Sequence, residues 1–159
     1  MDRYFEKISF ERFSLDVKND RKLYDEYKLP RRASKNSCGY DFLAMEDYII
    51  HPGEIKKIPT GYKSKFLSDE MLMIVVRSSM GFKYNVRMCN QVGVIESDYY
   101  NNISNEGHMW VALQNEGDKD YIINKGDAYA QGIFIKFLTC GDNPEEERIG
   151  GLGSTNKGD

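Results

Sequence analysis

The sequence predicts an all-β domain, an antiparallel sandwich or barrel with at most one short helix. Three observations favour this class: apolar segments are short, turn residues follow them at close intervals, and long helical periodicity is missing. A length of 159 residues suits one well-formed core and is short for two. Charged residues make up 30% and hydrophobic residues 40%, which is ordinary for a soluble domain.

The expected strands are apolar segments bounded by Gly, Pro, Asn and Asp. The run 71–76 is continuously apolar, which is typical of a strand buried on both faces. One short helix is expected across 80–84, and the segment 20–28 stays undecided between helix and loop. The predicted strands are 48–50, 55–58, 71–76, 109–113 and 132–137.

The C-terminal segment differs from the rest in composition. Residues 141–159 hold five glycines and almost no apolar residues, so they cannot build a core of their own. The chain is therefore divided into a β domain over 1–140 and a flexible, Gly-rich tail over 141–159.

Charge and cysteine usage exclude several classes of function. The net charge of −3 argues against a nucleic-acid or membrane-surface binder, and no apolar run is long enough to span a bilayer. The N-terminus lacks the apolar segment of a secretory signal. Three widely spaced cysteines indicate a reduced, cytoplasmic protein, and two isolated histidines are too few for structural zinc.

The most informative stretch is 90–100, which reads NQVGVIESDYY. An apolar run is followed at once by Glu96, Ser97 and Asp98, and then by two tyrosines. Carboxylates packed against an apolar run cost solvation energy unless they hold water, a cation or a proton. The pattern suits a pocket that orients water beside a ring-containing ligand, although an ordinary strand running into a loop explains it equally well.

Other islands of polar residues have the chemistry of a phosphate site. Arg77-Ser78-Ser79 ends the buried run and can cradle a phosphate, or else cap a helix with serines beside a surface arginine. Asp41 and Gln131 lie on or beside other predicted strands. In the tail, residues 148–155 combine an arginine, three glycines and two hydroxyls, which can wrap a polyphosphate.

In this order, the five islands resemble the five motifs of the trimeric dUTP pyrophosphatase (dUTPase) family. The resemblance implies an enzyme that hydrolyses dUTP to dUMP and pyrophosphate, with Mg²⁺ on the triphosphate. Such an enzyme sanitises the nucleotide pool and supplies the precursor of dTTP. The resemblance also implies a jelly-roll-like β fold and a homotrimer. Each active site would use all three chains, and the tail of one chain would close over the site of another. The matching segments are 39–41, 77–79, 93–99, 126–131 and 150–155.

The resemblance also implies roles for individual residues. Glu96 would be the general base that activates water against the α-phosphorus. Tyr99 would lie under the deoxyribose and exclude a 2′-hydroxyl. No direct metal ligand is expected, and Asp41 would orient Arg77 or a Mg²⁺-bound water. The uracil edge would be read by Asn90, Gly93, Val94 and Ile95. The α- and β-phosphates would be held by Arg77, Ser78, Ser79 and Gln131. From the tail, the site would be closed by Arg148, Leu152, Gly153, Ser154 and Thr155, with Arg148 acting in catalysis.

The chain departs from the family pattern at two places. The family's base is normally aspartate, and the extra methylene of Glu96 shifts the carboxylate by roughly one bond length, a misplacement that can cost ~10²-fold in rate. The tail has Leu152 where the family commonly has an aromatic ring that stacks on uracil. The resulting hypothesis is that His108 stacks on uracil instead, and a surface histidine on a loop is the alternative.

Two other functions fit the same scaffold. A catalytically weak nucleotide-binding or regulatory protein is suggested by Glu96 and the altered tail. A dCTP deaminase is disfavoured, because Ala112 stands where that related chemistry needs a glutamate.

Overall fold

The computed structural model describes residues 2–141. Strands dominate this part of the chain, and all of their pairings are antiparallel. The predicted all-β class is therefore confirmed. The strands are β1 (Tyr4–Lys7), β2 (Arg31–Arg32), β3 (Tyr40–Leu43), β4 (Tyr48–Ile50), β5 (Ile55–Pro59), β6 (Tyr62–Lys65), β7 (Glu70–Val75), β8 (Val86–Met88), β9 (Gly93–Glu96), β10 (Trp110–Asn115), β11 (Tyr121–Ile123) and β12 (Ala128–Lys136).

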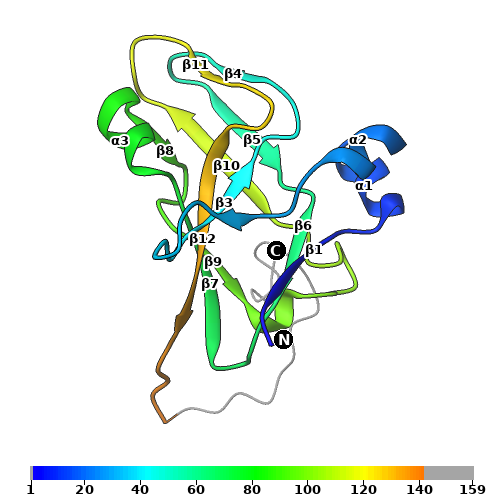
Figure 1. The fold of residues 1–159 in the computed structure, drawn as a ribbon. Coiled ribbons are helices and arrows are strands. Elements are labelled where there is room, and N and C mark those ends of the chain that lie inside the picture. The colour runs from blue at the N-terminus through cyan, green and yellow to red at the C-terminus, as the bar shows by residue number, and fades with distance from the viewer. Residues whose placement is uncertain (1, 142–159) are drawn as a thin grey trace, which may run out of the picture.

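The strands form four groups, of which the largest positions the polar islands. Its order is β2-β3-β12-β7-β9, so strands that are distant in sequence lie side by side (Figure 1). A second sheet has the order β5-β10-β8, and the pairs β1-β6 and β11-β4 complete the set. The long strand β12 runs through the middle of the largest sheet and contacts β3 on one side and β7 on the other.

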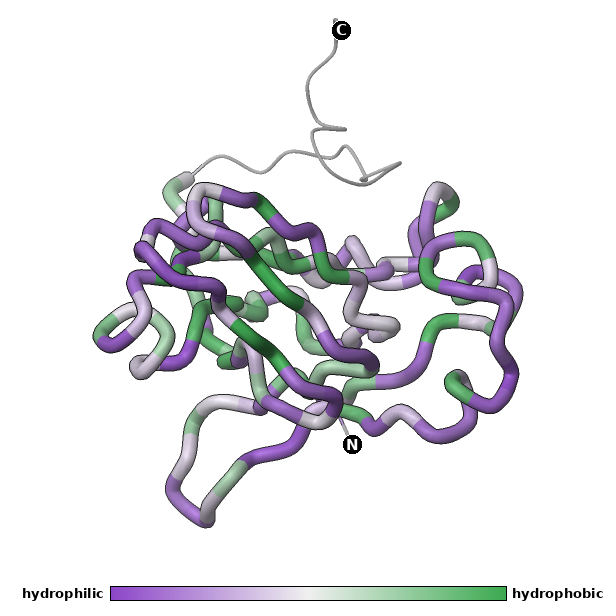
Figure 2. Tube along the Cα trace, turned by 90° about the horizontal axis from the view of Figure 1, so that it is seen from above, coloured by the Kyte–Doolittle hydropathy of each residue, from purple (hydrophilic) through white to green (hydrophobic). Residues whose placement is uncertain are grey.

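The core lies between the sheets, where apolar segments of the strands gather while hydrophilic segments occupy much of the outer loops (Figure 2). Along β7, Leu72 and Ile74 are fully buried, whereas Met71, Met73 and Val75 keep partial exposure. This alternation is the period of two that a strand imposes. The run 71–76 was predicted to be buried on both faces, and in the single chain only one face is fully buried.

The expectation of at most one short helix is wrong. The predicted helix is α3 (Ser78–Tyr84), but α1 (Phe10–Asp16) and α2 (Arg21–Glu26) precede the main sheet. The undecided segment 20–28 thus contains α2. Both extra helices begin at a side-chain cap, Ser9 for α1 and Asp20 for α2.

These two helices are stabilised by packing rather than by length. A helix of six or seven residues is not stable alone, and it offers too few turns for periodicity to be recognised. Phe13 of α1 is fully buried and stacks on Tyr27 with ring centroids 5.4 Å apart. Leu23 of α2 is buried in the same core. None of the helices within residues 2–141 combines the length and apolar character that crossing a bilayer requires.

Candidate active site

A pocket of about 330 Å³ brings together polar islands from three parts of the sequence. The sheet register explains the convergence, because Gln131 of β12 lies opposite Asp41 of β3 on one side and Val75 of β7 on the other. Arg77 follows β7 after one residue and precedes α3. The residues that line the pocket are Ala33, Ser37, Gly39, Asp41, Arg77, Ser78, Ser79 and Gln131.

The side chains in this pocket hold one another in place. Arg77 Nε lies 3.7 Å from Asp41 Oδ1, so the guanidinium is oriented by a half-buried carboxylate. Gln131 Nε2 donates to the Val76 carbonyl at 3.3 Å. A Cβ at Gly39 would lie 2.2 Å from Gln131 Oε1, so a larger residue there would displace this amide. The exposed cation and hydroxyls suit a phosphate ligand.

A tight hairpin joins β8 to β9 and carries the predicted uracil-reading residues. Gln91 has a φ of +61°, and Val92 N donates to the Asn90 carbonyl at 2.6 Å. Gly93 is buried where a Cβ would lie 3.2 Å from Ile74 Cβ. The side chain of Val94 is 55% exposed in the single chain. The hairpin thus carries exposed apolar surface at Val92 and Val94, which can face a ligand or another chain.

The predicted base lies at the opposite end of β9 from the hairpin. Glu96 is exposed, and its Cα pairs with Met71 at the start of β7. Arg77 lies six residues further along the chain from Met71, which at ~3.3 Å per residue is roughly 20 Å. Glu96 is accordingly not among the residues that line the Arg77 pocket.

Tyr99 lies directly after β9, in a short 3₁₀ helix (Ser97–Tyr99). Its side chain is only 7% exposed, and its hydroxyl donates to the His108 carbonyl at 2.9 Å. Asn105 Nδ2 donates to the same hydroxyl oxygen at 2.8 Å. Burial raises the pKa of the Tyr99 hydroxyl, so this phenol stays neutral. The ring is anchored from behind by the loop that follows it.

The hypothesis that His108 stacks on uracil is wrong for this structure. His108 is 0% exposed, and both ring nitrogens have partners inside the protein. Nδ1 lies 2.7 Å from Asp16 Oδ2, and Gly61 N donates to Nε2 at 3.0 Å. Asp16 was not identified from the sequence, because it is separated from His108 by 92 residues and no local pattern signals the contact.

Within residues 2–141, no group of three or more His, Cys, Asp or Glu side chains could hold a metal ion. Asp41 is the carboxylate that lines the Arg77 pocket. The predicted tail residues Arg148, Leu152, Gly153, Ser154 and Thr155 lie outside the described residues.

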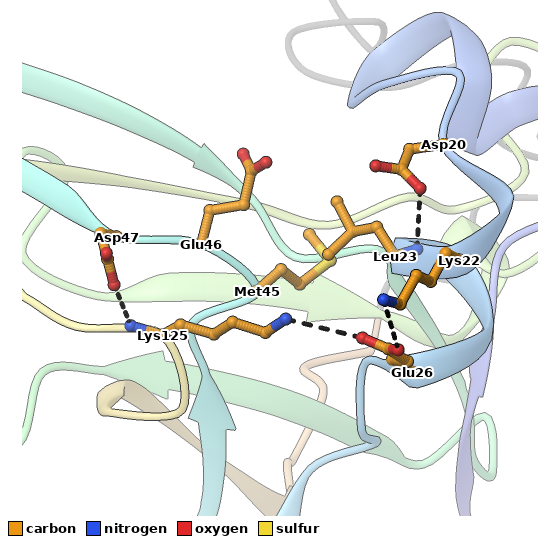
Figure 3. Close-up of a pocket in the computed structure, with 8 residues that line it drawn as sticks. All are labelled: Asp20, Lys22, Leu23, Glu26, Met45, Glu46, Asp47 and Lys125. Carbon is orange, nitrogen blue, oxygen red and sulfur yellow. Dashed lines mark hydrogen bonds and ion pairs between the residues drawn. The ribbon is translucent and has the colours of Figure 1, made fainter.

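A second pocket, of about 370 Å³, lies between α2 and the turns next to β4 and β12 (Figure 3). Its charges are largely paired with one another, since Glu26 is 3.7 Å from Lys125 Nζ and 3.9 Å from Lys22 Nζ. The Asp47 carboxylate accepts from the backbone N–H of Lys125 at 2.6 Å. Because its lysines are already paired with Glu26, this pocket is a poorer anion-binding site than the Arg77 pocket.

Comparisons with known proteins agree on one family. The family model described as dUTPase matches residues 25–158. A deoxyuridine 5′-triphosphate nucleotidohydrolase of Lactococcus lactis is 45% identical over 130 residues, covering 80% of this chain and 87% of the relative. One from Haemophilus influenzae is 36% identical over 154 residues, covering 90% and 97%. The crystal structure of dUTPase from Streptococcus mutans matches with a TM-score of 0.68 and 35% identity, covering 87% of this chain and 98% of that chain.

Proposed function

The chain belongs to the dUTPase family, and we propose that it hydrolyses dUTP to dUMP and pyrophosphate by attack of water on the α-phosphorus. The observation that carries this proposal is the pocket in which Asp41, Arg77 and Gln131 converge with two serines from α3. A guanidinium, two hydroxyls and an amide beside one carboxylate suit the α- and β-phosphates of a nucleotide.

The nucleoside would be recognised by the β8–β9 hairpin and by Tyr99. Backbone groups of Gly93, Val94 and Ile95, together with Asn90, would pair with the uracil edge. A closed hairpin leaves no space for the methyl group of thymine, and unpaired polar groups reject other bases strongly. Tyr99 would lie under the deoxyribose, where its fixed ring leaves no room for a 2′-hydroxyl.

Glu96 would act as the general base. Water attacks the α-phosphorus in line as its proton passes to the Glu96 carboxylate. A bond from the water oxygen to phosphorus forms, and the bond from phosphorus to the α–β bridging oxygen breaks. Pyrophosphate leaves with the bridging oxygen. The proposal is supported by the position of Glu96, three residues beyond the start of the uracil-reading strand and three before Tyr99.

Magnesium would enter with the substrate. Mg²⁺ binds phosphate oxygens together with one or two carboxylates and keeps several waters. The pocket fits this preference, because Asp41 is a half-buried carboxylate beside the phosphate-binding groups. On the triphosphate the ion would neutralise charge, and Asp41 would accept hydrogen bonds from its waters while it orients Arg77. A mutant dUTPase from phage phi11 of S. aureus, 18% identical to this chain, coordinates a structural Mg(II) ion.

The active site would be shared between the chains of a homotrimer. The strand length of roughly 20 Å between Met71, which pairs with Glu96, and Arg77 supports sharing, since it separates the proposed base from the guanidinium of the same chain. Tail residues of a third chain, among them Arg148, Ser154 and Thr155, would hold the γ-phosphate. The role of Leu152 and Gly153, which would close over the uracil, stays a prediction. The cytoplasmic location of the protein also stays a prediction.

An assay of pyrophosphate release from dUTP with Mg²⁺ tests the chemistry. Wild type should turn over, Glu96→Gln should lose ~10²–10⁴-fold in kcat, and Glu96→Asp should retain or gain activity. Equal turnover by wild type and Glu96→Gln would remove Glu96 from the mechanism. Wild-type turnover at background, with dUTP still bound, would favour a regulatory nucleotide-binding protein.

A complementation experiment tests the sharing. Arg77→Ala and Glu96→Gln chains are each expected to be inactive alone. When they are unfolded and refolded together at equal amounts, about a quarter of the sites should combine an intact Arg77 pocket with an intact Glu96 from another chain. Activity near a quarter of wild type supports shared sites, and no recovery in verified mixed oligomers would contradict them.

A further inference from the structure

A buried histidine–carboxylate pair lies behind Tyr99. Gly61 N donates to His108 Nε2, so this nitrogen carries a lone pair and the proton is on Nδ1, which faces Asp16. The ring is therefore neutral and fixed in one tautomer. Burial lowers the pKa of His108, and the Asp16 carboxylate opposes this effect. The other charged groups that act on the ring are Arg12 and Glu106.

The histidine is connected to Tyr99 through its own backbone. The His108 carbonyl accepts the Tyr99 hydroxyl at 2.9 Å, and Asn105 Nδ2 donates to that hydroxyl at 2.8 Å. Gly107 has a φ of +81°, and a Cβ there would lie 2.6 Å from the Tyr99 carbonyl oxygen. A shift of the His108 backbone would therefore strain or break the hydrogen bond from the Tyr99 hydroxyl.

Helix α1 fixes the same loop at two further points. Arg12 donates to the Ser104 carbonyl at 2.8 Å. The Glu106 carboxylate accepts from both the hydroxyl and the backbone N–H of Ser9, at 2.5 and 3.0 Å. The contact between Asp16 and His108 is the most buried of these tethers, since the His108 side chain is inaccessible. Helix α1 and its N-cap Ser9 thus contact this loop through Ser9, Arg12 and Asp16.

We propose that Asp16 and His108 are positioning residues for Tyr99, which set its ring under the sugar and so fix the selectivity for deoxyribose over ribose. This inference rests on the proposed function, because it takes Tyr99 to be the sugar-facing ring. Protonation of His108 would place an N–H at Nε2 against the N–H of Gly61, donor against donor. The position of Tyr99 would then respond to pH as well as to mutation.

Asp16→Leu tests the pair, because it removes the acceptor for the Nδ1 proton. The KM for dUTP should rise roughly threefold to tenfold, the value of one hydrogen bond, and the ratio of kcat/KM for dUTP over UTP should fall by a similar factor. The kcat should change by less than about twofold, because Tyr99 contacts the sugar in the ground state and the transition state alike. Asp16→Asn keeps an acceptor oxygen and should restore most of the selectivity.

The chain offers a matched control at its other histidine. His51 Nδ1 lies 2.8 Å from Asp120 Oδ1 on the surface, in the turns beside β4 and β11. Asp120→Leu should change neither KM nor selectivity. An active wild type together with a folded Asp16→Leu of unchanged KM and selectivity would overturn the inference. A wild type without turnover would instead overturn the proposed function.

A spectroscopic measurement on wild type tests the same inference without the Asp16→Leu variant. The His108 ring lies 5.2 Å from Trp110, the single tryptophan of the chain, so Trp110 emission should report protonation of His108. If Asp16→Leu does not fold, wild type decides: KM should rise and selectivity fall as pH drops through the Trp110 transition. Kinetics that stay flat across that transition would refute the positioning role. Nitrogen NMR should show the imidazole protonated on Nδ1, and the Nε2 tautomer would refute it equally.

Discussion

Gly39→Ala should impair phosphate binding without unfolding the protein. The added Cβ would lie 2.2 Å from Gln131 Oε1, whereas carbon and oxygen atoms in contact stay about 3.5 Å apart, so the amide has to move by roughly 1.3 Å. That movement breaks the 3.3 Å bond from Gln131 Nε2 to the Val76 carbonyl. The displaced amide would also lose its proposed hydrogen bond to the substrate phosphate. A lost hydrogen bond to a charged group costs about 1.5–3 kcal/mol, which corresponds to a fall in kcat/KM of roughly tenfold to a hundredfold.

Steady-state kinetics with dUTP and thermal unfolding together check this prediction. Stability should fall by about 1 kcal/mol or less, because the collision is with the end of a movable side chain. In a Gln131→Ala background the same substitution should cost little more, since the displaced amide is gone and only the Cβ of residue 131, 3.3 Å away, remains. If Gly39→Ala left kcat/KM at the wild-type value, the placement of Gln131 in the phosphate site would be refuted.

The remaining predictions concern stability. Because burial holds the pKa of His108 below its ordinary value of about 6.5, the folded state binds fewer protons than the unfolded state, so stability should be lost as pH falls below about 6.5. Thermal unfolding between pH 7 and 5 should show this loss, His108→Gln should flatten it, and His51→Gln should not. Phe13→Ala should cost about 3–5 kcal/mol in urea unfolding, because the ring is fully buried, and a cost below about 1 kcal/mol would contradict the packing of α1. Gly81→Ala should stabilise the chain by up to about 1 kcal/mol, since nothing lies within 4 Å of the new Cβ, and a loss of stability would contradict the open face of α3.

The strands could be predicted where local pattern and burial agree. The segment 48–50 coincides with β4, and the run 71–76 overlaps β7 almost entirely. β12 was found only from residue 132 onward, because its first four residues contain a polar Gln131 and small alanines that dilute the apolar signal. Helices α1 and α2 were missed because they are stabilised by burying Phe13 and Leu23, and that information lies in distant partners.

For the candidate site too, some features could be predicted from the sequence and others depend on distant partners. The polar residues of the pocket could be identified from the sequence by their types. The antiparallel register then brings Asp41, Gln131 and the segment before Arg77 into one pocket. The burial of His108 could not be predicted, because it depends on Asp16, which is 92 residues away, and on the backbone of Gly61. A histidine between Gly107 and Met109 is compatible with an exposed loop and with a buried tether, and only the tertiary fold decides between them.

The register of β7 and β9 bears on the proposal that the active site is shared between chains. Gly93 lies opposite Ile74, next to the row that holds Gln131, whereas Glu96 lies opposite Met71 at the far end of the pair. A nucleotide whose base is read by the hairpin and whose α-phosphorus meets Glu96 therefore runs along β9 away from Arg77 of the same chain. Its phosphates would then lie away from the part of the sheet that holds the Arg77 pocket of the same chain. Because an antiparallel pair fixes this direction, the register supports the proposal that a second copy of the chain supplies the cation.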